Sequence, residues 1–70
     1  MVSKSQQRKI AQRIYELELI IQSNLNKNPE IVKKAEDELI AIPEKYNLGL
    51  SDLFEIDDLV QDILKSVDLN

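Results

Sequence analysis

The stretch IQSNLNKNPEIV, residues 21–32, ends one helix and begins another. Its middle, NLNKN, holds three asparagines, which favour turns because their side chains bond to nearby backbone groups. Asn28-Pro29-Glu30 then has the features of a helix start. Asparagine suits the cap, proline suits the first helical position, and an early acid complements the helix dipole. A short connection of this kind predicts two antiparallel neighbouring helices.

The segment before the turn, about residues 5–24, has apolar residues at helical spacing and no residue that breaks a helix. Its apolar stripe is Ile10, Ile14, Leu17, Ile21 and Leu25. The segment after the turn repeats this pattern over 29–42, with Val32, Ala35, Leu39 and Ile42 on the stripe. Pro43 disfavours helical angles at the residue before it, which favours an ending near Ala41. The alternative is a helix that kinks at Pro43 and extends to residue 47.

Asn47 and Gly49 predict a second joint, because both residue types tolerate left-handed backbone angles. Ser51 is the expected cap of a third helix over about residues 52–66. The apolar stripe of that helix is Leu53, Ile56, Val60, Ile63 and Val67. No stretch alternates with the period of two that a strand requires. Residues 1–70 are therefore predicted to form one all-α domain, either a small three-helix bundle or a helical hairpin plus a third helix.

Size and composition limit how such a domain is stabilised. A chain of 70 residues hides only about 60% of the surface that its unfolded form exposes. Cysteine is absent, which excludes disulfides and thiolate metal sites, and histidine, the commonest general base, is absent too. Regular helix packing and a partner chain remain as sources of stability. We therefore expect self-association or a protein partner, no cofactor or metal, and no enzymatic activity.

No apolar run approaches the roughly 20 residues that span a bilayer. The basic residues near the N-terminus are not followed by the apolar segment of a signal peptide. A cytoplasmic protein without membrane contact is expected, and the opening Met1 predicts a complete small protein.

The charge is unevenly distributed along the chain. The net charge is −4, but residues 1–27 carry five basic and two acidic residues, whereas residues 51–70 carry one and six. The basic N-terminal patch consists of Lys4, Arg8, Lys9 and Arg13. One interpretation pairs this patch, within the chain or between subunits, with the acids that begin the third helix: Asp52, Glu55, Asp57 and Asp58. The other is a contact with the phosphates of nucleic acid, including that of the ribosome.

Three bulky residues of the first helix fall outside its apolar stripe: Tyr15, Leu19 and Ile20. At 100° per residue, Leu19 lies almost opposite the stripe and the other two lie on its flanks. A three-helix monomer cannot easily bury all three, and contiguous apolar surface usually marks an interaction site. These residues are the predicted surface for self-association or a partner. Ile40 is expected to be an isolated exposed residue, and Phe54 to cover the second joint.

Glu55, Asp58 and Asp62 share one face of the third helix, opposite its apolar stripe. Spacings of three and four allow carboxylates to share a divalent ion, but helical di-metal sites use inward-facing carboxylates together with histidine. The prediction is a solvated acidic face without a metal.

The layout of the first helix, the turn and KNPEIVKKAEDELIAIPEKY, residues 27–46, is similar to that of the short helical-hairpin phosphatases that act on aspartyl-phosphate response regulators. That family shares a Ser-Gln-Glu-Leu-Asp motif on its second helix. The corresponding residues 35–39 read AEDEL, without the serine, the glutamine or an acid after the leucine. The likeness covers the topology, and no site residue carries over.

The sequence therefore predicts a non-enzymatic interaction or regulatory module that docks through helix faces onto itself or onto another protein. The alternative is a nucleic-acid-binding or ribosome-associated protein that uses the basic N-terminal patch. A metal-dependent or other enzyme is a distant third.

Overall fold

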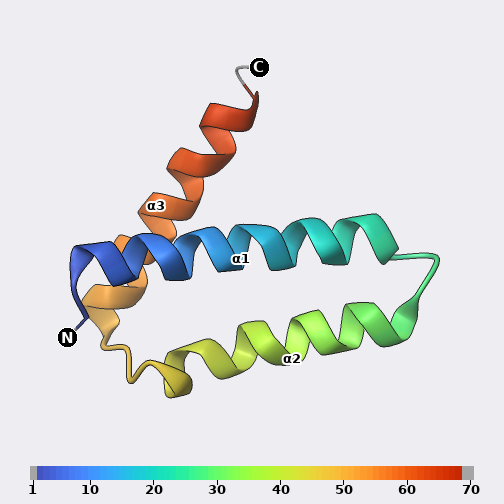
Figure 1. Cartoon of the computed structure of the whole chain (residues 1–70), viewed down its shortest axis with the longest axis horizontal. Coiled ribbons are helices and arrows are strands. Elements are labelled where there is room, and N and C mark those ends of the chain that lie inside the picture. The colour runs from blue at the N-terminus through green and yellow to red at the C-terminus, as the bar shows by residue number, and fades with distance from the viewer. Residues whose placement is uncertain (1, 69–70) are drawn as a thin grey trace.

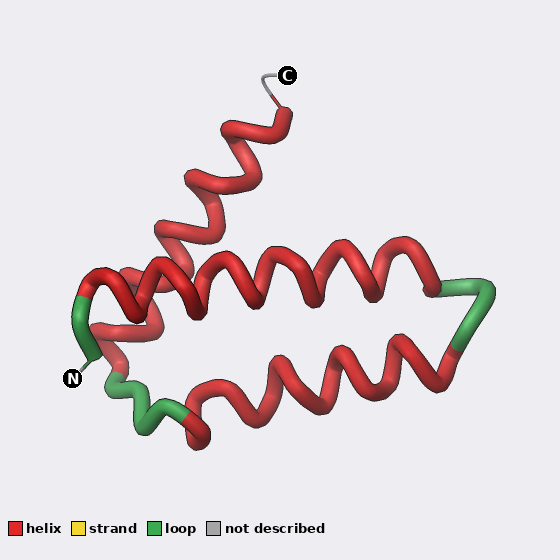
Figure 2. Tube along the Cα trace, viewed as in Figure 1, coloured by secondary structure: helices red, strands yellow, loops and turns green. Residues whose placement is uncertain are grey.

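The computed structural model describes residues 2–68, which form three helices (Figures 1 and 2). They are α1, Lys4–Asn24, α2, Pro29–Lys45, and α3, Leu50–Asp68. No strand is present within residues 2–68, and the predicted all-α, three-helix class is confirmed.

α1 and α2 form an antiparallel hairpin closed by the turn at residues 25–28 (Figure 2). Pro29 begins α2 and Glu30 lies in its first turn, as the sequence predicts. Asn28 holds the cap position without a side-chain bond to the helix, since its amide donates to Asn24 Oδ1 at 3.3 Å. The Asn28 side chain therefore stabilises the turn, and the free amides of α2 do not receive the side-chain bond that was expected.

α2 runs without interruption through Pro43, so the ending near Ala41 that the sequence favours is not observed. Proline costs the helix one backbone hydrogen bond. The continuation nevertheless keeps Ile42 only 4% exposed and allows Tyr46 to pack against the core. Burial of these side chains outweighs the local preference of the residue before proline for extended angles.

The joint between α2 and α3 is capped by a different residue from the one predicted. Asn47 has a left-handed φ of 51°, which asparagine tolerates. α3 begins at Leu50, ahead of Ser51. The Gly49 carbonyl accepts the first helical hydrogen bond, and the Gly49 N–H donates to the Asp52 carboxylate at 3.1 Å. Gly49 is the cap residue and Asp52 is the third residue of α3, so this bond is one of the two that make up a capping box. Asp52 therefore caps α3, and Ser51 does not.

α1 is the central helix, because both other helices pack on it while α2 and α3 scarcely touch each other. α3 starts beside the N-terminal turns of α1, crosses α1 obliquely and then points away from the hairpin (Figure 1). The principal axes measure 37 × 32 × 15 Å. The shortest axis is less than half as long as either of the others. The arrangement is flat and open.

The core lies along α1 and takes residues from all three helices. Its buried apolar members are Ile10, Ala11, Leu17, Ala35, Ile42, Ile56 and Val60. Ala11 has 0% exposure although it lies outside the predicted stripe. Ala11 lines a hollow together with Leu59 and Ile63 of α3. A small side chain at such a helix crossing lets the two helices approach closely, which explains its burial. Leu25, the last residue of the predicted stripe, is 58% exposed because α1 ends there.

Candidate functional site

The three residues of the predicted α1 surface do not share one environment. Leu19 is 44% exposed on the side of α1 opposite the core stripe. Tyr15 is half-buried one turn earlier. Ile20 packs against the core and lines a hollow with Leu17 and Ala35 on the α2 side. The open part of this surface is therefore Leu19 together with the exposed part of Tyr15.

A second open surface, with mostly apolar lining residues, lies where α2 and α3 diverge from α1. A hollow of about 250 Å³ opens there between the three helices, and we call it the wedge. Its apolar lining is Ile14, Leu39, Ile42, Pro43, Leu48, Leu53, Ile56 and Val60. Its other lining residues are Glu18, Asp57 and Gln61. The wedge exists because α3 crosses α1 and does not lie along the groove between α1 and α2 (Figure 1).

The first turns of α3 extend this apolar surface outward. Leu50, Leu53 and Phe54 are 69%, 38% and 65% exposed, and their spacing makes them neighbours on the helix surface. Leu53 also lines the wedge. The sequence pattern predicts Leu53 in the buried stripe and Phe54 over the joint, and it places Leu50 before the helix. The spacing of Leu50, Leu53 and Phe54 at positions i, i+3 and i+4 shows in the sequence that they share one side of a helix. That this side is open to solvent follows only from the structure, in which α3 separates from α2.

A buried polar cluster joins the N-terminal ends of α1 and α3. Gln7 and Asp52 are each 4% exposed. The Gln7 side-chain amide donates to Asp52 at 3.1 Å and to Glu55 at 2.8 Å, which uses both of its N–H groups. Asp52 also accepts the capping bond from the Gly49 N–H. A neutral amide, which sequence reasoning did not select, therefore binds the acids at the start of α3.

Two bases of the basic N-terminal patch meet the acidic face of α3 across the contact between α1 and α3. Lys4 and Arg8 line a hollow with Glu55 and Asp58, and Arg8 lines the next hollow with Asp62. The acidic face is exposed, but it borders α1. Within residues 2–68, no ion pair joins these bases to these acids. Opposite charges near each other without fixed pairs influence the orientation of the helices more than the stability of the fold.

Arg13 belongs to the contact between α1 and α2. Its Nε and Nη2 donate to the two carboxylate oxygens of Glu38 at 2.6 and 2.9 Å, and its Nη1 donates to Glu16 at 3.4 Å. The hydrogen bonds from Arg13 lower the pKa of Glu38, against a smaller opposing effect of desolvation. The bond to Glu38 likewise raises the pKa of Arg13. One base of the patch is thus neutralised within the hairpin.

Replacing Arg13 with glutamine is expected to return the pKa of Glu38 toward its usual range. Because the folded-state pKa is depressed, the pair stabilises the fold above the unfolded-state pKa of Glu38. That stabilisation is lost as the pH falls through the folded-state value. NMR titration of the Glu38 carboxyl checks the shift, and denaturation across the same pH range checks the linkage. Lys9→Gln is the control, and an unchanged Glu38 titration in Arg13→Gln would contradict the pairing.

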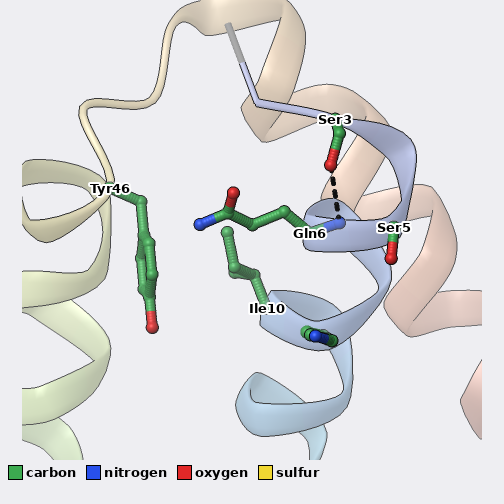
Figure 3. A pocket seen from close by; sticks show the side chains of 6 residues that line it. Ser3, Ser5, Gln6, Ile10 and Tyr46 are labelled. Carbon is green, nitrogen blue, oxygen red and sulfur yellow. Dashed lines mark hydrogen bonds between the residues drawn. The ribbon is translucent and has the colours of Figure 1, made fainter.

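A polar hollow of about 400 Å³ lies between the first turn of α1 and the end of α2 (Figure 3). Ser3 accepts a hydrogen bond from the Gln6 backbone N–H at 3.1 Å and thereby caps α1. The Gln6 side chain extends toward the ring of Tyr46 (Figure 3). Lys9 lines the same hollow and is therefore separated from Lys4 and Arg8, which face α3. The four bases of the patch do not form a single surface.

Comparison of the chain with protein-family models, curated proteins and solved structures finds no match. In the part of the chain that the structure describes, no group of three or more acidic, histidine or cysteine side chains is placed to hold a metal ion. None of the helices in residues 2–68 has the combination of length and apolar character that crossing a membrane requires. The fold and its surfaces define a class, namely a small all-α domain with an open apolar groove.

Proposed function

We propose that this protein is a non-enzymatic protein–protein interaction module that docks through the helix faces its own fold leaves uncovered. The observation that carries the proposal is the course of α3, which crosses α1 and leaves the wedge open. Leu50, Leu53 and Phe54 stay exposed beside it. Contiguous apolar surface of this kind commonly serves protein–protein interaction.

The exposed area supports the same function. The chain exposes 5414 Å², whereas a compact monomer of 8.1 kDa exposes about 4,500 Å². The difference, roughly 900 Å², is close to the ~800 Å² that each partner buries in a standard interface. The radius of gyration of 12.8 Å also exceeds the value of about 11 Å typical of a 70-residue domain. A partner that covers the open faces would supply the burial that the single chain lacks.

Self-association through Leu19 and the exposed part of Tyr15 is tested first. In sedimentation equilibrium we expect an average mass above 8.1 kDa that rises with concentration. Leu19→Glu places a charge in this apolar contact and is expected to weaken self-association at least about tenfold. Ile40→Glu is the control, because Ile40 is 76% exposed on α2 and outside this surface. Circular dichroism checks that both variants keep their helices.

Three results would change this conclusion. A mass of 8.1 kDa at every concentration would contradict self-association and leave a different protein as the partner. Loss of helicity in Leu19→Glu would place Leu19 in the core. Nucleic-acid binding that weakens steeply with salt and is lost in Arg8→Glu would favour the nucleic-acid alternative.

A further inference from the structure

We infer that the wedge is the binding site for a basic amphipathic helix of a partner protein. The inference rests on the proposed docking function and specifies the chemistry of the partner. The incoming helix inserts apolar side chains into the wedge and places lysine or arginine on its flanks against the acids around the wedge.

The shape of the open surface suits a helix. In a closed three-helix bundle the third helix occupies the groove between the other two, but α3 covers only the end near the N-terminus of α1 (Figure 1). Half-buried residues continue the groove beyond that point. Ile21 lies two turns after Ile14 on α1, and Val32 lies two turns before Leu39 on α2. A strip of this kind receives a helix that carries apolar residues at positions i, i+3, i+4 and i+7.

The size of the wedge favours side chains as its occupants. Its volume of about 250 Å³ is below the range of about 300–1,000 Å³ that is typical of small-molecule sites. Apolar side chains inserted from a partner require less space, and such anchors supply most of the energy of an interface. Leu50 and Phe54, exposed on the same side of α3 as Leu53, add apolar contact area outside the hollow.

The charges around the wedge determine which helix it accepts. The charged residues that line it, Glu18 of α1 and Asp57 of α3, are both acidic. Neither makes an ion pair within residues 2–68. Glu36 is exposed on α2, three residues before Leu39 and therefore on a neighbouring part of the same face. An incoming helix thus meets an acid on each of the three helices, which attracts basic flanks and repels acidic ones.

A second copy of the chain fits the wedge less well. Its α3 carries six acidic residues and one basic residue, so that it would bring acids against acids. Its α1 begins with basic residues, but Ile10 and Leu17 on the apolar stripe of α1 are already buried in its own core. A basic helix from a different protein meets neither obstacle.

The test uses the full chain and three labelled peptides of about 18 residues, or five helical turns. The first peptide carries a leucine face flanked by lysines, and the second has glutamate in place of lysine. The third has the composition of the first in an order that forms no apolar face. Fluorescence anisotropy measures affinity, and amide chemical shifts locate the site. We expect the basic amphipathic peptide to bind at least about tenfold more tightly than either of the others, with the largest shifts around the wedge.

Two variants test the contacts themselves. Leu53→Lys is expected to weaken binding of the basic peptide at least about tenfold, since it replaces an apolar contact with a like charge. Ile31→Lys is the matched control, because Ile31 is 43% exposed and Leu53 is 38% exposed, but Ile31 lies on α2 outside the wedge. Asp57→Lys changes an exposed position and preserves the apolar lining. It is expected to shift the preference toward the acidic peptide.

The other outcomes separate the inference from the proposed function. If the basic and acidic amphipathic peptides bind equally well and Leu53→Lys weakens both, the inference that the partner helix is basic would be wrong. The proposal that a helix docks at the wedge would stand. The inference would also be overturned if the scrambled peptide bound as tightly as the basic amphipathic peptide, or if Leu53→Lys left binding unchanged. Either result would mean that the peptide is held only by general attraction to the acids of α3. Amide shifts around the wedge that change with the concentration of the free protein would give the wedge to a second copy. Binding of none of the peptides would overturn docking at the wedge itself.

Discussion

Replacing Leu17 with alanine is expected to leave most of the protein unfolded at 25 °C. Leu17 is 2% exposed and is the largest fully buried side chain among the described residues. Deleting a buried leucine side chain to alanine costs about 3–5 kcal/mol, because transfer energy is lost and a cavity remains. A single core in a domain of this size rarely supplies more than ~3–5 kcal/mol. The expected loss therefore matches the whole stability of the fold.

Far-UV circular dichroism and urea denaturation measure this effect. The matched control is Leu19→Ala, the same substitution two residues later on α1, where the side chain is 44% exposed. That variant is expected to lose less than about 1 kcal/mol. Both proteins are compared at one concentration, since self-association would make the measured stability concentration-dependent. Similar losses in the two variants would contradict the assignment of Leu17 to the core.

The second large effect is expected from Asp52→Ala, which should destabilise the fold by about 2–3 kcal/mol. Asp52 is 4% exposed and accepts hydrogen bonds from the Gln7 amide and from the Gly49 N–H. The substitution removes the cap of α3 and leaves one N–H of Gln7 without its buried partner. It also removes the carboxylate that complements the dipole at the start of α3.

Urea denaturation of three proteins tests this account. Asp58→Ala is the control, since it removes an exposed carboxylate six residues later on α3 and should change stability little. Asp52→Asn keeps an oxygen acceptor of similar size and is expected to lose less than Asp52→Ala. Equal stability of Asp52→Ala and the wild type would show that Gln7 and Asp52 do not hold the two helices together.

The helices and the first turn were predictable because their signals are local. The spacing of Ile10, Ile14 and Leu17 predicts α1, and Asn28-Pro29 predicts the start of α2. Local signals failed at the second joint. There the burial of Ile42 carries α2 through Pro43, and the bond from Gly49 to Asp52 starts α3 early. Gln7 was missed although it lies three residues before Ile10 on the apolar stripe. Its hydrogen-bond partner Asp52 belongs to another helix, and the sequence does not show which residues of two helices meet.

The sequence by itself determined that this chain forms three helices, two of them joined as a hairpin, because helix formation depends on residues within about four positions of each other. Only the tertiary structure decided the path of α3 over the small side chain of Ala11, the separation of Lys4 and Arg8 from Arg13, and the opening of the wedge. These features depend on contacts between residues far apart in the chain. Periodicity shows which face of a helix is apolar, but the packing of side chains from different helices sets the crossing angle and thus decides which apolar faces remain open.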